Sequence, residues 1–191
     1  MAGKPDAPVA KVGNTRKKVT LVRFLPGDAI FEDVRFNYDT VFRRLQELAY
    51  LNRGLKIVFL DERVSDPARR ETTFHYEGGI IDYVRYLNDG KTVLHDQPIY
   101  LEGQKDSVIC RVAIQYTDGY TESLFSYVNN IPTAEGGTHE MGFKAGFTRA
   151  LNDYARKVGA LKEKVAHFKF GWVAQYPVLK YFNLFQDLTI H

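Results

Sequence analysis

The chain contains 191 residues, enough for one domain or two small ones with a buried core. Apolar residues make up 45% of the chain and charged residues 26%, and these values exclude wholesale disorder. Lysine and arginine together number 26 against 23 acidic residues, so the net charge of +3 does not by itself predict nucleic-acid binding.

Two further features bear on the cellular setting. No apolar run approaches the roughly 18 residues of a membrane span, and residues 1–18 are polar and basic, without the apolar core of a secretory signal. Cys110 is the single cysteine, so no internal disulfide can form. These features predict a cytoplasmic protein with no membrane contact.

The N-terminal part of the chain divides at a proline and a glycine. Residues 1–18 are basic and contain little that can pack, so we expect a flexible basic lead-in. Residues 19–25 are short, apolar and rich in β-branched side chains, which predicts a strand. Pro26 and Gly27 end that strand.

A helix followed by two strands is expected next. Asn37 or Asp39 can cap the helix, because a short side-chain oxygen accepts a hydrogen bond from the first backbone N–H groups. Apolar residues then recur at three-to-four spacing up to a stop at Gly54. Strands are predicted at residues 55–60 and 72–77, separated by a charged loop.

The middle of the chain predicts a second helix and a β-meander. The helix begins after Gly79 and ends by Gly90. Residues 98–131 resemble a meander, in which Asp118-Gly119 is a typical two-residue hairpin turn.

A long helix closes the predicted fold. Thr138 can cap it and Gly159 can end it, with an apolar stripe between them. The resulting order of elements describes an α+β domain with one layer of helices on one sheet.

A metal site is not expected. His139-Glu140 opens like the zinc-protease signature HExxH, but position 143 is Phe143, so the second histidine ligand is absent. The remaining histidines lie too far apart in sequence to suggest a ligand set; they are His75, His95, His167 and His191. We therefore interpret His139 as a hydrogen-bonding residue near a helix start.

A nucleotide site and a catalytic nucleophile are also not expected. Residues 137–144 nearly spell a phosphate-binding loop, but Phe143 separates Gly142 from Lys144 and no Ser or Thr follows to hold Mg²⁺. Cys110 lies among valines and isoleucines, which predicts a buried, inert thiol. No G-x-S-x-G elbow is present, so no catalytic residue is predicted.

The last helix is rich in basic residues. They are Lys144, Arg149, Arg156, Lys157, Lys162 and Lys164, against Glu140, Asp153 and Glu163. Two interpretations remain open: a solvated face, or a face turned toward phosphate, where counterion release would dominate binding.

Three segments, residues 36–63, 74–88 and 112–164, closely resemble the transducer domain of the DNA gyrase B family. The resemblance runs in order from about Val9 to Lys164. Its most specific block is NNIPTAEGGTHEMGFKAGFTRALNDYAR, whose shared residues helical or strand periodicity would not require. SYVNNI with EGGTHE resembles gyrase more than its sister, topoisomerase IV.

The resemblance implies a fold and a role. The fold would be an α+β transducer like that of GHMP kinases and a small-subunit ribosomal protein, with one helical layer on a mixed sheet and a left-handed βαβ crossover. The parent would be an ATP-dependent type II topoisomerase that couples ATP binding and hydrolysis to DNA strand passage and introduces negative supercoils. Its partners would be the gyrase A protein and a second copy of the gyrase B protein.

The resemblance also implies a weak, non-specific contact with double-stranded DNA. The basic residue of the family's G-F-[K/R] step falls on Lys144, and Arg149 is a weaker candidate for the same cavity wall. Lysine in place of arginine keeps the charge but loses the bidentate geometry.

Two departures from the family predict that the chain alone is inactive. Nothing here supplies the ATP domain's catalytic glutamate, Mg²⁺-binding asparagine or glycine lid, and no Gln-Thr-Lys loop follows Lys164. No cofactor-binding residue is therefore expected, and ATP and Mg²⁺ would belong to the parent protein. The expected organisation is a lead-in at residues 1–18, a transducer at 19–164 and an atypical tail at 165–191.

That tail is dense in aromatic residues and has three open interpretations. It is an unrelated sequence, a divergent substitute that fills a vacant sheet edge, or a partner-binding strand. An open edge and exposed aromatics predict either dimerisation or ordering of the tail against the sheet.

Two rival functions for the whole chain are weighed against the transducer. The first is a stand-alone nucleic-acid-binding module that uses the basic helix, and the last is a small metabolic kinase.

Overall fold

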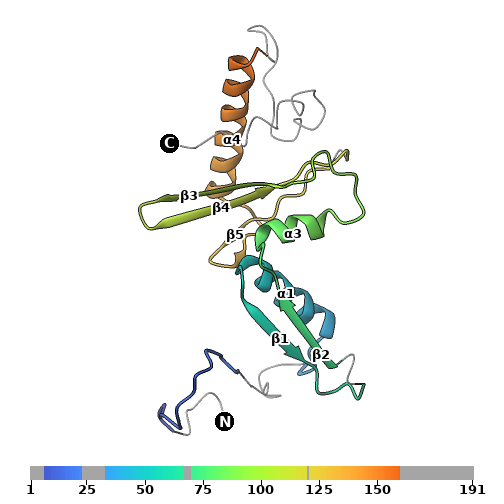
Figure 1. Ribbon diagram of the computed structural model, residues 1–191, viewed down its shortest axis with the longest axis vertical. Coiled ribbons are helices and arrows are strands. Elements are labelled where there is room, and N and C mark those ends of the chain that lie inside the picture. Colours follow the sequence, from blue (N-terminus) through green and yellow to red (C-terminus); the bar gives the residue numbers. More distant parts are fainter. Residues whose placement is uncertain (1–6, 23–32, 67–69, 120, 160–191) are drawn as a thin grey trace. The chain divides into compact units, whose positions relative to one another are not determined.

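The computed structural model describes residues 7–22, 33–66, 70–119 and 121–159. The chain divides into two compact units, residues 1–42 and 43–191. The helices and strands, labelled in Figure 1, are α1 (Tyr38–Leu51), β1 (Lys56–Leu60), β2 (Glu71–His75), α3 (Ile80–Leu87), β3 (Ile99–Lys105), β4 (Val108–Ile114), β5 (Tyr127–Val128), β6 (Ile131–Pro132) and α4 (Thr138–Lys157).

Helix α1 forms as predicted and is capped by Asn37. The Asn37 Oδ1 atom accepts a hydrogen bond from the backbone N–H of Thr40 at 3.0 Å, while Asp39 lies in the first turn. The stop at Gly54 is also confirmed. Gly54 has a φ of 75°, a left-handed conformation that favours glycine, and its N–H donates to the Tyr76 carbonyl at 3.1 Å.

Strands β1 and β2 form an antiparallel pair close to the predicted ranges. Ile57 lies opposite Phe74 and Phe59 opposite Thr72, so these residues share one face of the hairpin. Phe74 is buried, whereas Val58 and Leu60 on the other face are exposed.

Helix α3 follows two glycines, as the sequence predicts. Gly79 is the N-cap residue with a φ of 61°, and a Cβ atom there would lie only 3.1 Å from the Arg53 Cβ. Asp82 turns back and accepts a hydrogen bond from the Gly78 N–H at 2.8 Å. The helix therefore begins where only a residue without a side chain fits easily.

The β3–β4 hairpin corrects the predicted turn. These strands are joined at Asp106 and Ser107, and Asp106 has a φ of 53°. Asp118-Gly119 does not connect two paired strands, because residues 121–126 carry no strand. Instead, Asp118 is hydrogen-bonded to an earlier segment of the chain, because its backbone N–H donates to the Thr92 carbonyl at 3.0 Å.

The prediction for Cys110 is wrong, because its thiol is exposed. Cys110 lies opposite Gly103 in the outer half of the β3–β4 hairpin, where Val108 and Ile109 are exposed as well. A two-stranded ribbon buries neither face unless another element covers it, so an apolar strand pattern here does not produce burial.

Strands β5 and β6 form a short hairpin around Asn129 and Asn130. Both asparagines have positive φ angles, 50° and 66°, which is typical of a type I′ turn. The predicted cap of helix α4 is off by one residue, because the N-cap lies one position before Thr138. Gly137 occupies the N-cap position without a side-chain cap, and Thr138 is the first helical residue rather than the cap.

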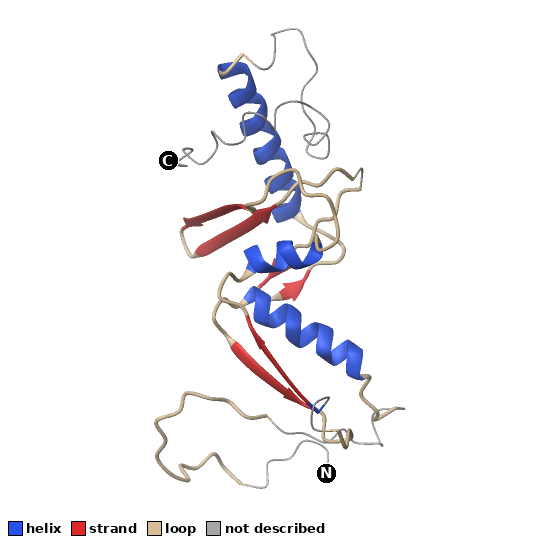
Figure 2. Ribbon diagram, turned by 45° about the vertical axis from the view of Figure 1, so that its right-hand side comes forward, coloured by secondary structure: helices blue, strands red, loops and turns tan. Residues whose placement is uncertain are grey.

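Within the described residues, the strands do not form one sheet. Figure 2 shows them as separate pairs, and over these residues they make three two-stranded antiparallel sheets. The prediction of a single sheet under one helical layer is therefore not met by the described strands, and a βαβ crossover, which needs parallel strands, is not among them. Residues 19–22 of the predicted strand 19–25 are exposed and carry no strand, since no described segment pairs with them. Residues 23–25 and the tail at 165–191 lie outside the described residues.

Two packing centres can be recognised among the described residues between 43 and 159. The first is the tyrosine cluster, whose members are Tyr50, Tyr76, Tyr83 and Tyr86. The second is the Leu151 cluster, in which Leu151 packs against Ile99, Tyr116 and Phe147. Leu151 retains 1% of its exposure, so this cluster fixes one face of α4.

Candidate nucleic-acid interface

Helix α4 carries the residues that the sequence singles out as candidates for DNA contact. It is 20 residues long and contains four basic residues against two acidic ones. Its buried residues are Leu151, Asn152 and Ala155. The Asn152 side chain does not need an outside partner for its N–H, because its amide donates to the Thr148 carbonyl at 2.7 Å.

Lys144 lies on the packed side of α4 and is bound by two carboxylates. Its Nζ atom is 2.9 Å from Glu122 Oε1 and 3.2 Å from Glu140 Oε1. The side chain keeps 35% of its exposure. Hydrogen bonds to Glu122 and then to Glu140 raise the pKa of the Lys144 ammonium above its usual value. Lys144 is therefore a cation whose charge is already balanced within the protein.

Arg149 is placed quite differently, with 86% of its side chain exposed. Its Nε atom is 3.9 Å from Asp153 Oδ2, and the same carboxylate group is 3.0 Å from Arg156 Nη1 through its other oxygen. Such exposed pairs contribute little to stability and exchange readily with solvent or another anion. Lys162 and Lys164 of the predicted basic set lie outside the described residues.

The structure does not bring Lys144 and Arg149 together. At about 100° per residue, five residues separate them by roughly 140° around the helix. Leu151 and Ala155 lie seven and eleven positions after Lys144, close to its own angular position, and both are buried. Lys144 thus belongs to the packed face of α4, whereas Arg149 belongs to the solvent face.

In the glycine-rich approach to α4, His139 and the Glu140 carboxylate lie close to other groups of the protein itself. His139 Nε2 lies 3.2 Å from Thr133 Oγ1, in keeping with the predicted hydrogen-bonding role. Glu140 occupies the first turn, where its charge favours the helix dipole but opposes an incoming phosphate. Within the described ranges, no group of three or more His, Cys, Asp or Glu side chains is arranged to hold a metal ion.

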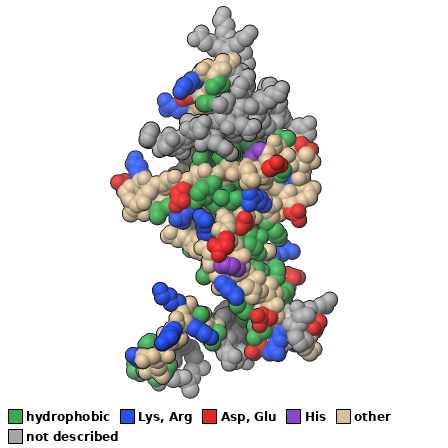
Figure 3. Space-filling view, viewed as in Figure 1, with side chains coloured by type: hydrophobic (Ala, Val, Ile, Leu, Met, Phe, Trp, Pro, Cys, Tyr) green, Lys and Arg blue, Asp and Glu red, His purple; other side chains and the backbone are tan. Residues whose placement is uncertain are grey.

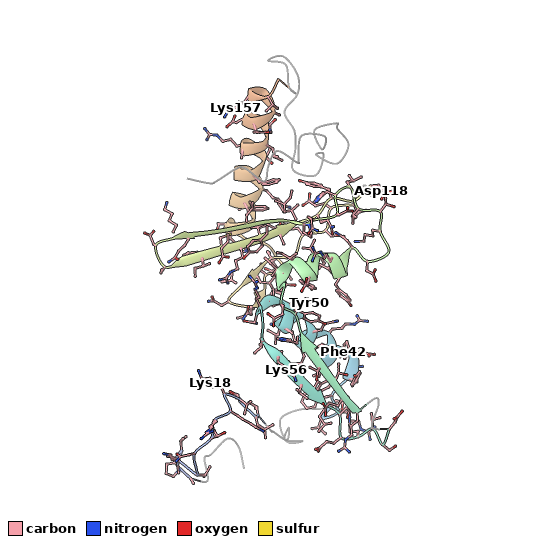
Figure 4. All side chains as sticks on the ribbon, in the orientation of Figure 1. Lys18, Phe42, Tyr50, Lys56, Asp118 and Lys157 are labelled. Atoms are coloured by element: carbon pink, nitrogen blue, oxygen red, sulfur yellow. The ribbon has the colours of Figure 1, made fainter. Side chains whose placement is uncertain are left out.

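Over the middle of the face drawn in Figure 3, Lys and Arg side chains lie interspersed with Asp and Glu side chains. Lys157, labelled in Figure 4, marks the last turn of α4, which also holds Arg156. No helix in the described part of the chain combines the length and apolar character needed to cross a bilayer.

Sequence reasoning missed the tyrosine cluster. Tyr50 is 4% exposed, and its ring centroid lies 3.6 Å from that of Tyr76 and 4.9 Å from that of Tyr83. Figure 4 labels Tyr50 at the end of α1. The helical spacing of Tyr83 and Tyr86 is a usable signal, but Tyr50 and Tyr76 come from other elements and only the fold joins them.

A hydrogen-bond network lies beside this cluster. The Tyr127 hydroxyl donates to Glu47 Oε1 at 2.5 Å, and Glu47 also pairs with Arg44. Arg44 Nη2 donates to the Asn130 carbonyl at 2.7 Å, and the Asn130 side-chain amide donates to Asn52 Oδ1 at 3.1 Å. The β5–β6 turn is therefore tied to α1 by charged and neutral hydrogen bonds.

Three tyrosines of this region, Tyr50, Tyr83 and Tyr127, have a raised pKa that favours the neutral form. Burial, followed by hydrogen bonds, raises the pKa of Tyr50 and of Tyr127 far above the ordinary value, and burial raises the pKa of Tyr83. A neutral Tyr127 can donate its single proton to Glu47, which matches the short distance between them. These contacts join the β5–β6 turn to α1.

Comparison with known proteins locates the chain in a family. Residues 79–175 match the model of the family described as DNA gyrase B. The match continues past Lys164, so the expectation that the resemblance ends there is wrong. Among curated relatives, the B subunit of DNA gyrase from Clostridium acetobutylicum is 49% identical over 84% of this chain and 25% of its own length. The B subunit of DNA topoisomerase 4 from Enterococcus faecalis is 47% identical over 85% of this chain and 23% of its own length.

A solved structure supports the same assignment. The 43K ATPase domain of Thermus thermophilus gyrase B, in complex with an aminocoumarin, superposes with a TM-score of 0.66 at 36% identity. That likeness covers 76% of this chain and 39% of the Thermus chain. The chain spans about a quarter of the length of the first curated relatives that it matches. From its own residues and these likenesses, the chain belongs to the DNA gyrase B family.

Proposed function

We propose that this chain is the transducer segment of the gyrase B protein of an ATP-dependent type II topoisomerase. One observation carries the proposal: the family match covers α3 through α4 and beyond, while the chain spans only a quarter of its curated relatives. The segment would couple ATP binding and hydrolysis, performed elsewhere in the parent protein, to the passage of DNA and the introduction of negative supercoils. It would do so by moving as a rigid body relative to the neighbouring ATP domain.

The described residues support a mechanical role better than a chemical one. Aromatic stacking around Tyr50 and the hydrogen bonds from Arg44 to the β5–β6 turn couple three elements that are distant in sequence. A packed body of this kind transmits a rigid-body movement, because close-packed interiors deform little. The left-handed crossover of the transducer fold forms part of this proposal.

The nucleotide chemistry is assigned to the parent protein. A triphosphate needs a cradle of free donors and a lysine able to contact it. Here the segment before α4 faces the Glu140 carboxylate, and the nearby Lys144 is bound by two carboxylates. These residues do not fit a nucleotide phosphate, so we expect this chain alone to hydrolyse no ATP. ATP and Mg²⁺ would act in the parent.

The partners follow from the same proposal. Arg149, on the solvent face of α4, and Lys144, through the 35% of its side chain that stays exposed, would line the cavity that holds double-stranded DNA, with weak and sequence-independent contacts. A second gyrase B protein and the gyrase A protein would complete the assembly in the cytoplasm. Residues 1–18 would form the edge of the ATP domain, and the transducer would begin at residue 19 and continue past Lys164, because the family match runs to residue 175.

A chimera tests the proposal directly. Residues 36–159 of this chain replace the corresponding segment of the Clostridium acetobutylicum gyrase B protein, which is assembled with its gyrase A partner. We expect ATP-dependent supercoiling of a relaxed plasmid to be retained, while the present chain alone turns over no nucleotide. A chimera that folds and hydrolyses ATP but never supercoils, or a robust ATPase rate from the present chain, would reject the proposal.

A second candidate function is a stand-alone nucleic-acid-binding module. The exposure of Arg149, together with Arg156 and Lys157 in the last turn of α4, favours it. Such a module would bind tightly and with a steep dependence on salt, about 0.9 in the log–log slope for each phosphate neutralised. Weak binding with a shallow slope would instead fit the transducer.

A further inference from the structure

The Lys144 ammonium is held by carboxylates from two separate segments. Glu140 lies one turn before it on α4, whereas Glu122 comes from the strand-free residues 121–126. Glu122 is the nearer of the two, at 2.9 Å. Because two carboxylates surround one ammonium, this group of three carries a net negative charge even though Lys144 is basic.

The Glu140 carboxylate is itself positioned by its surroundings. Its Oε1 atom contacts Lys144, while its Oε2 atom lies 3.4 Å from the Ser126 hydroxyl. Ser126 Oγ is in turn 2.5 Å from Thr133 Oγ1. Gly136 has a φ of 72°, and a Cβ atom there would lie 3.1 Å from Glu140 Oε2, so the turn before α4 leaves room for this carboxylate.

We propose that Glu122 and Glu140 are positioning residues that hold Lys144 and limit its contact with duplex DNA. The proposal rests on the proposed function, in which Lys144 faces the DNA cavity. A phosphate that approaches Lys144 meets the repulsion of two carboxylates and has to displace Glu122 before it gains a hydrogen bond from Nζ. Movement of residues 121–126 would remove one of the two carboxylates while Glu140, on the same helix, stays.

The consequence for binding is electrostatic. DNA affinity grows when a protein cation replaces counterions on the phosphates, and a cation that is already neutralised replaces fewer of them. Lys144 should therefore contribute little to the salt dependence of binding in the native chain. Once its carboxylates are neutral, it should contribute about one full phosphate contact.

The experiment measures binding of the full chain to a short, fluorescently labelled DNA duplex over a range of potassium chloride concentrations. Four proteins form a cycle: the native chain, Lys144→Gln, the double variant Glu122→Gln/Glu140→Gln, and the triple variant. Glutamine keeps the shape of glutamate, and circular dichroism verifies that each variant retains the helix content of the native chain.

We expect the double variant to bind about threefold to tenfold more tightly at low salt, with a log–log slope steeper by about 0.9. Lys144→Gln should change little in the native background and should abolish the whole gain in the double variant. The single variant Glu122→Gln, which leaves the Glu140 contacts intact, should show part of the gain.

A gain that persists in the triple variant, or the absence of any gain, would overturn the proposal. So would the absence of measurable binding by every variant at the lowest salt. The charge-matched control is Glu77→Gln/Glu102→Gln, whose carboxylates pair with His75 and Arg111 instead. It separates a specific effect from a general loss of negative charge. Supercoiling by the chimera is independent of this cycle, so failure of the Lys144 proposal is distinguishable from failure of the proposed function.

Discussion

The tyrosine cluster and the Leu151 cluster stabilise the described residues between 43 and 159 in different ways. Around Tyr50, aromatic rings from α1, from α3 and from Tyr76, just after β2, stack on one another, and polar groups nearby form hydrogen bonds. Around Leu151, one fully buried aliphatic side chain packs against three partly buried neighbours. The first region depends on many partners and the second on one residue, so they should respond differently to substitution.

The largest expected effect is that of Tyr50→Ala. Tyr50 is 4% exposed and stacks on three other tyrosines, so its removal leaves a cavity and breaks the aromatic contacts. We expect the free energy of unfolding to fall by about 3–5 kcal/mol. Urea unfolding followed by far-ultraviolet circular dichroism measures this change.

The comparison with the other region serves as the control for Tyr50. Leu151→Ala should cost about 2–3 kcal/mol, since a leucine is smaller than a tyrosine and has few described neighbours. Met141→Ala, at a side chain that is 65% exposed on the same helix, should cost less than about 0.5 kcal/mol. Equal losses for Tyr50→Ala and Met141→Ala would contradict the packing described for the tyrosine cluster.

A smaller effect is expected from Tyr127→Phe. The change deletes only the hydroxyl that donates to Glu47 at 2.5 Å, in a partly buried site. A hydrogen bond to a charged group there is worth about 1.5–3 kcal/mol, so the free energy of unfolding should fall by about that amount.

Tyr100→Phe provides a matched control, because the Tyr100 hydroxyl donates to the Glu102 carboxylate at 2.8 Å in an exposed site. Water replaces that bond easily, and the loss there should be smaller. If both substitutions cost the same in urea unfolding, burial of the Glu47 network does not strengthen it.

The helices of this chain could be predicted well from local signals. Asn37 before α1, Gly54 after it and the glycine pair before α3 each act within one turn of the backbone, so their effect does not depend on the rest of the fold. Gly159, with a φ of 72° after α4, is a further case.

Strand pairing could not be predicted in the same way. Asp118-Gly119 carries a strong turn signal, but the residues before it pair upstream, as the 2.8 Å bond from the Leu94 N–H to the Tyr116 carbonyl shows. Which strands pair depends on contacts between distant segments, and Cys110 is exposed for the same reason.

The resemblance to the gyrase B family points to Lys144 as a DNA-contacting residue, and that role stays a prediction. Its surroundings are not predictable from the sequence, because the pairing with Glu122 joins positions 22 residues apart. The helical spacing of four residues predicts the contact of Lys144 with Glu140, but it cannot predict the contact with Glu122, which lies in a distant loop. Most of what sets the charge at Lys144 therefore came from the tertiary structure.

The smallest effect concerns the acid side of the stability curve. Asp61, after β1, accepts hydrogen bonds from Arg63 Nε at 2.8 Å and Nη2 at 2.7 Å, and these lower the pKa of the Asp61 carboxyl from 3.8 to about 2. A lowered pKa in the folded state stabilises the fold above the unfolded pKa, near pH 4, and that contribution disappears as the pH falls toward 2.

Asp61→Asn should therefore lower the urea midpoint at pH 6 and make the midpoint less sensitive to pH between about 4 and 2. Arg63→Gln removes the partner that lowers the pKa, so it should flatten the acid slope in the same way. Urea titrations at several pH values compare the three proteins. Parallel curves for the native chain and Asp61→Asn would show that this pair adds no pH-dependent stability, and that the strand end is held instead by the 2.7 Å bond from the Asp61 N–H to the Arg70 carbonyl.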